Sequence, residues 1–214
     1  MEQLSFIESF EAPFDIVVLY IVLIFNLALT LAHFVQELKG FQWRYLGAIA
    51  GLKIPDKLGF KFFFVGPLLI ICLFGLVGIF RLFDWPPPPL AAFCLGALIG
   101  SRISDSIFIH ISPSKQGYCP NPALGTIPFY LLEAPILTAL FFPGLRSHYI
   151  CAVLGFGLGW LLFSGVLPLL RFLRKNKHIA PKFLRTIKHI EPWQAGEKIP
   201  PWVQGHDNEE ARSV

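Results

Sequence analysis

Four polar side chains interrupt the first long apolar run of the sequence: Asn26, Thr30, His33 and Glu37. Their spacings of 4, 3 and 4 residues place them within about 60° of one another on one face of a helix. Imidazole and carboxylate groups can bind a divalent metal or act as an acid–base pair. Because such a stripe is costly inside a bilayer, it indicates a functional site.

Later apolar runs carry more ionisable groups. Arg102, Asp105 and His110 lie in the second half of one run, and Glu133 lies near the centre of the next. On a helical wheel the first three, with Ser106, occupy an arc of about 140°. Ionisable groups within membrane spans usually face the bundle interior and pair with one another. We therefore expect these helices to bring their polar groups together at a similar depth.

This convergence defines the candidate site. The candidate catalytic residues are His33, Glu37, Arg102, Asp105, His110 and Glu133, and the candidate metal ligands are His33, His110 and Glu37. Structural roles remain open for each: a polar cap at a helix end, an ion pair that fixes the bundle register, or a buried carboxyl with a raised pKa.

The composition identifies the elements that must hold these side chains. The chain is 54% hydrophobic and 15% charged, whereas soluble domains are about 25% charged. We predict an all-α, polytopic membrane helix bundle with about five transmembrane helices and a lipid bilayer around it. The net charge of +4 is too small to indicate a nucleic-acid partner.

The chain divides into three regions: an acidic lead (1–13), the transmembrane bundle (14–170) and a basic, Pro/Trp-containing tail (171–214). The tail holds a possible short amphipathic helix at 180–190. The expected spans are 14–34, 62–80, 90–111, 123–142 and 148–170.

The distribution of basic residues predicts the orientation of the bundle. Of the 18 Lys and Arg residues, 15 fall in the 38–61 connector, the 112–122 loop and the tail, and two fall on the other side. Basic residues favour the cytoplasmic side. We expect the N-terminus outside and the C-terminus in the cytoplasm.

Two spans carry small residues at every fourth position, which allow helices to pack closely. The positions are Ala92, Gly96, Gly100 and Ser104 in one span and Cys151, Gly155 and Gly159 in the other. These ridges and the tail are also the surfaces on which other membrane subunits would bind.

The segment His33-Phe-Val-Gln36-Glu37 resembles the signature of the HxxEE family of uncharacterised integral membrane proteins, with Gln36 in place of the first Glu. Asp105, His110 and the turn that begins at Tyr118 are similar to that family's later pattern. The resemblance covers residues 14–142 and implies a membrane protein with an enzymatic role.

Two functions fit these patterns. The first is a membrane-embedded enzyme, metal-dependent or acid–base, that acts on an apolar or lipid-like substrate. The second is a non-catalytic accessory subunit of a respiratory or photosynthetic complex, in which His33 or His110 contacts a haem or a chlorophyll-type pigment. A transporter is disfavoured because no internal repeat is evident.

Overall fold

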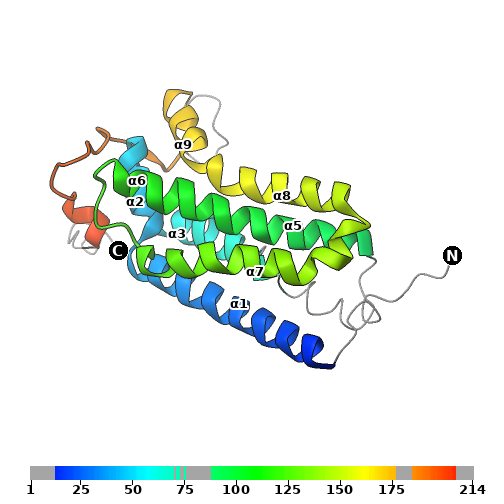
Figure 1. The fold of residues 1–214 in the computed structure, drawn as a ribbon. Helices are drawn as coiled ribbons and strands as arrows, with labels where there is room; N and C mark the ends of the chain where they lie inside the picture. Colours follow the sequence, from blue (N-terminus) through cyan, green and yellow to red (C-terminus); the bar gives the residue numbers. More distant parts are fainter. Residues whose placement is uncertain (1–12, 70, 73–74, 76–87, 177–184, 206–214) are drawn as a thin grey trace.

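The computed structural model of the chain describes residues 13–69, 71–72, 75, 88–176 and 185–205, which are mostly helical (Figure 1). The main helices are α1 (Pro13–Lys39), α5 (Pro88–Ser104), α7 (Ile127–Arg146) and α8 (Tyr149–Ser164). They lie side by side, with α5 between α7 and α8 and with α1 against α7 (Figure 1). The predicted all-α class is confirmed.

One continuous helix, Pro88–Lys115, is long and apolar enough to cross a membrane, within the part of the chain that the structure describes. It joins α5, the π-helical segment η3 (Asp105–Ile111) and α6 (Ser112–Lys115). A second such segment exists if α8 and α9 (Val166–Lys175) count as one span. The five-span bundle stays a prediction, and its second span, 62–80, lies partly outside the described residues.

The fifth expected span, 148–170, does not run straight, because α8 and α9 meet at a 50° bend. Gly165 joins the two helices. Glycine is a poor helix former, and Pro168 has no N–H to donate to the Ser164 carbonyl. These two residues explain why the chain kinks there.

The small-residue ridges form a close contact between α5 and α8. A Cβ on Gly100 would lie 2.3 Å from the Phe156 carbonyl oxygen, and a Cβ on Gly155 would lie 1.9 Å from that of Phe93. Only glycine fits at such distances, as the four-residue spacing predicted. The contact lies inside this chain, and binding of other subunits stays a prediction.

A layer of short elements covers one end of the bundle (Figure 1). We call residues 41–59 and 185–205 the cap. Its elements are α2 (Gln42–Ala50), β1 (Leu52–Lys53), α3 (Asp56–Gly59), β2 (Lys188–His189) and the 3-10 turn η6 (Pro201–Gln204). After the cap's first part, the chain continues into the π-helical segment η1 (Phe60–Val65).

The tail contributes to the buried part of the cap. Trp193 and Val203 are buried against α2 residues, and β2 pairs antiparallel with β1. The amphipathic helix expected at 180–190 is therefore wrong at Lys188 and His189, which form a strand; residues 177–184 lie outside the described part. Pairing with β1 satisfies main-chain groups that a helix would have satisfied locally.

Candidate metal centre

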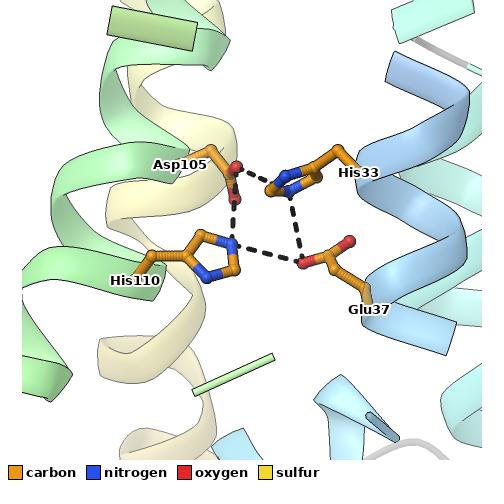
Figure 2. Close-up of side chains that lie close together, drawn as sticks. All are labelled: His33, Glu37, Asp105 and His110. Atoms are coloured by element: carbon orange, nitrogen blue, oxygen red, sulfur yellow. Dashed lines mark ion pairs between the residues drawn. The ribbon is translucent and has the colours of Figure 1, made fainter. Parts of the chain in front are cut away.

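Two helices each contribute two side chains to a buried cluster. His33 and Glu37, one turn apart on α1, face Asp105 and His110 of η3 (Figure 2). None of the four is more than 6% exposed. One ligand atom from each lies within 4.8 Å of all the others. We call these residues the four-residue cluster.

The distances within the cluster are short. The Nε2 atom of His33 lies 3.1 Å from Asp105 Oδ2 and 3.7 Å from Glu37 Oε1. The Nε2 atom of His110 lies 3.6 Å from Glu37 Oε1 and 3.7 Å from Asp105 Oδ2. Metal–ligand bonds of about 2.0–2.1 Å in a tetrahedron place ligand atoms about 3.4 Å apart. The cluster therefore has the dimensions of a metal site.

The π-helical geometry of η3 brings Asp105 and His110 to one face. Residues five apart in an α-helix point about 140° away from each other. In a π-helix, which bonds residue i to residue i+5, the same pair differs by only about 50°. The arc of about 140° expected for an α-helix is therefore wider than the arc in η3. Short π-helical segments frequently occur at functional sites.

Hydrogen bonds fix the ring of His33. Its Nδ1 atom lies 2.6 Å from the Thr126 hydroxyl oxygen, at the end of the 3-10 turn η4 (Leu124–Thr126). That hydroxyl donates its own hydrogen to the Ala123 carbonyl at 2.8 Å. The hydroxyl oxygen must therefore accept from His33 Nδ1–H, which directs the Nε2 atom at the carboxylates of the cluster.

Asn121 fixes the ring of His110 in the same way. The Asn121 amide nitrogen donates to the main-chain carbonyls of Ile109 and His110 at 3.1 and 2.9 Å, which orients the amide. Its Oδ1 atom then lies 2.9 Å from His110 Nδ1 and accepts that N–H. The Nε2 atom of His110 is thus also directed at the carboxylates of the cluster. Such outer hydrogen bonds are typical of metal-ligating histidines.

The cluster therefore directs two imidazole Nε2 atoms and two carboxylates at one another. Protons on the two Nε2 atoms or a metal cation among the four side chains would each hold them at these distances. Mixed imidazole and carboxylate ligands suit zinc or iron. A haem or pigment would need an open plane in front of Nε2, and the carboxylates of Glu37 and Asp105 stand there.

Comparison with known proteins does not identify this site. No family model, curated protein or solved structure matches the chain. Membership of the HxxEE family stays a prediction. In that segment His33 and Glu37 are buried whereas Gln36 is exposed, so the Gln36 side chain lies outside the cluster.

The remaining two candidate residues form a separate, adjoining network. Arg102 Nε lies 3.4 Å from Glu133 Oε2, and Arg102 Nη2 donates to the Thr30 hydroxyl. Asn26 donates to Glu133 Oε1 at 2.7 Å. Asn26 and Thr30 of the opening stripe thus hold this ion pair and do not enter the four-residue cluster. We call these four residues the Arg102 network.

Tyr130 connects the two sets. Its ring centroid lies 4.0 Å from the Arg102 guanidinium carbon and 4.4 Å from the His33 ring centroid. The six candidate catalytic residues therefore divide into a four-residue cluster and a neighbouring ion pair. Tyr130, Thr126 and Asn121 were not among the predicted site residues; Asn121 lies in the loop between the third and fourth spans, and Thr126 and Tyr130 are polar positions early in the fourth.

An apolar cavity of about 460 Å³ extends to the cluster. Glu37 and Asp105 are among its lining residues, and 15 of the 18 described lining residues are apolar. The volume is within the range of about 300–1,000 Å³ typical of small-molecule sites. The cavity gives an apolar molecule access to the two carboxylates.

Proposed function

We propose that this protein is a membrane-embedded, metal-dependent enzyme that acts on an apolar or lipid-like substrate. His33, His110 and Glu37 bind the metal, and Asp105 is the general base. The observation that carries this proposal is the orientation of both imidazoles by Thr126 and Asn121, which directs their Nε2 atoms at two carboxylates.

The ligand set favours a catalytic over a structural metal. With His33, His110 and Glu37 as the ligands and Asp105 outside the coordination sphere, a fourth position would stay open for water, as in catalytic zinc sites. A metal held there would supply an activated water. Asp105 lines the cavity, and its Oδ1 atom has no hydrogen-bond partner among the described residues. That oxygen is free to accept the proton of the water as it attacks the substrate.

The Arg102 network acts beside this chemistry. Arg102 and Glu133 balance each other's charge between α5 and α7, and Tyr130 transmits their position to the His33 ring. Their role in the proposal is to position α1 and to hold the Arg102 guanidinium on the Tyr130 ring beside His33.

The surface supports a bilayer environment. On α8 the side chains of Ile150, Val153, Leu154 and Leu161 are 58–66% exposed. Exposed aliphatic groups of this density suit lipid better than water. The proposed orientation has the N-terminus outside and the C-terminus cytoplasmic. Reporter fusions at both ends test it, and reporters active on the same side would contradict it.

Metal analysis tests the function. The full chain is purified in detergent, and bound metals are measured for the wild type, His33→Ala and His110→Ala. His189→Ala, an exposed histidine in the cap, is the control. About one metal per chain is expected in the wild type and control, with little left in the other two variants. Metal content that does not depend on His33 or His110 contradicts the proposal; His-dependent visible absorbance would support the pigment-binding subunit.

A further inference from the structure

Gln42 is the third polar residue that lines the apolar cavity, beside Glu37 and Asp105. It is 3% exposed, and neither its amide nitrogen nor its amide oxygen has a hydrogen-bond partner among the described residues. A buried amide without partners is unfavourable. A molecule in the cavity that hydrogen-bonds to Gln42 would remove that cost.

The conformation of the local backbone places Gln42 at the cavity. Phe41, the preceding residue, adopts the left-handed conformation with φ 50°. A side chain with a Cβ rarely adopts it. Gly40 lies so close to Pro122 that a Cβ there would be 2.5 Å from the proline Cβ. The tight turn starts α2 at Gln42, only five residues after Glu37.

The residues that line the rest of the cavity indicate the polarity and charge of the molecule that it binds. The walls come from Leu, Ile, Val, Phe and Pro side chains, including Leu46, Phe62 and Leu162. No Lys, Arg or His is among the described lining residues. An anionic head group would therefore lie beside two carboxylates with no cationic side chain to pair it. A divalent metal would leave the cluster neutral, which favours a neutral head group.

We propose that the cavity binds a single-chain amphiphile whose apolar chain fills the cavity and whose neutral acyl group, an ester or amide, hydrogen-bonds to Gln42. Bound this way, the carbonyl lies next to the water-activating site formed by Glu37 and Asp105. The inference names the substrate class and rests on the proposed function. Gln42 is a positioning residue, because it holds the acyl group and takes no part in proton transfer.

Equilibrium binding to the full chain in nanodiscs tests this inference. The probes are a radiolabelled medium-chain N-methyl alkanamide, the matched free fatty acid and the matched alkylamine. The amide should bind most tightly. Gln42→Leu, which retains the volume, should weaken amide binding about tenfold, and Gln204→Leu, at an exposed glutamine of the cap, should not change it. Leu162→Trp, which fills the cavity, should abolish binding of the amide.

Each outcome decides one of the two proposals. Equal amide affinity in Gln42→Leu and the wild type overturns the inference, as does tighter binding of the fatty acid or the amine. Metal content is measured on the same samples. Metal without a Gln42 effect leaves the proposed function standing and removes this inference. A Gln42 effect without metal removes the enzyme proposal and leaves the acyl site.

Discussion

The cap and the four-residue cluster contain similar residue types and use them differently. In the cap, Arg44 donates to Asp56 through Nε at 2.7 Å and also through Nη2, and its Nη1 donates to the Trp202 carbonyl at 2.7 Å. Trp43 donates to the same carboxylate at 3.0 Å. Both charges of this pair therefore meet an opposite charge and further hydrogen-bond partners.

In the cluster, only one side of each imidazole has a hydrogen-bond partner. The Nδ1 atoms of His33 and His110 are hydrogen-bonded, while their Nε2 atoms face carboxylates without a hydrogen bond among the described residues. The contrast shows that a buried charged residue indicates a binding site only when its partners leave it incomplete.

Asp105→Asn should separate metal binding from catalysis. If Asp105 is the base, turnover of an acyl amphiphile should fall by about 10²–10⁴-fold while the metal content stays near that of the wild type. Mass spectrometry of the released product measures turnover, and elemental analysis measures the metal content. Asp56→Asn in the cap is the matched control. Loss of metal together with turnover would instead make Asp105 an essential ligand.

Thr126→Val should weaken metal binding without touching a ligand. The His33 ring would lose the acceptor that holds its Nδ1–H, and loss of such outer hydrogen bonds typically costs about 10–100-fold in metal affinity. Competition with a chelator measures this. Thr138→Val is the control, because the Thr138 hydroxyl donates only within α7, to the Ala134 carbonyl. Equal affinities in the two variants would contradict the tautomer assignment.

The close contact between α5 and α8 at the glycines should stabilise the bundle without contributing to the chemistry. Gly100→Ala places a Cβ against the Phe156 carbonyl and should destabilise the protein by about 1–3 kcal/mol. Gly157→Ala, where nothing lies within 4 Å of a new Cβ, should be neutral or slightly stabilising. Thermal unfolding in detergent compares them. Equal unfolding temperatures would show that α5 and α8 do not depend on this contact.

The cap ion pair should give a small, pH-dependent effect. The hydrogen bond from Arg44 holds the pKa of Asp56 below its usual value. The stabilisation is complete above the pKa of the unfolded chain, about 4, and declines as the pH falls through the lower folded pKa. Because Asp56 is 40% exposed, less than about 1 kcal/mol is expected.

Thermal unfolding of the wild type and Asp56→Asn across this pH range measures the cap effect. The variant should be less stable at pH 7, and the difference should disappear in acid. A difference that persists unchanged below the folded pKa would show that the substitution acts through packing and not through charge.

Local periodicity predicted the parts of the site that lie within one regular helix. The stripe from Asn26 to Glu37 is buried as the α-helical wheel indicated. The close contact of the glycine ridges also followed from their spacing. In both cases the sequence interval alone determines which side chains share a face.

The other parts of the site depend on backbone geometry and tertiary contacts, which residue spacing in the sequence does not show. The π-helical turn joined Asp105 and His110, and the kink before Pro168 divided the last helix of the bundle. The separation of Arg102 from the cluster arises from tertiary packing of α1, α5 and α7. Gln42 went unnoticed because a single amide in a connector carries no pattern of its own.

The π-helical segment also bears on how this site could vary among related chains. A chain with one residue fewer between the equivalents of Asp105 and His110 would return to an unbroken α-helix. The pair would then be four residues apart and still share a face. Chains with either spacing could therefore build the same centre, and a motif search should accept both lengths. The π-helical turn holds one residue more than an α-helical turn, and it keeps the two ligands aligned at this longer spacing.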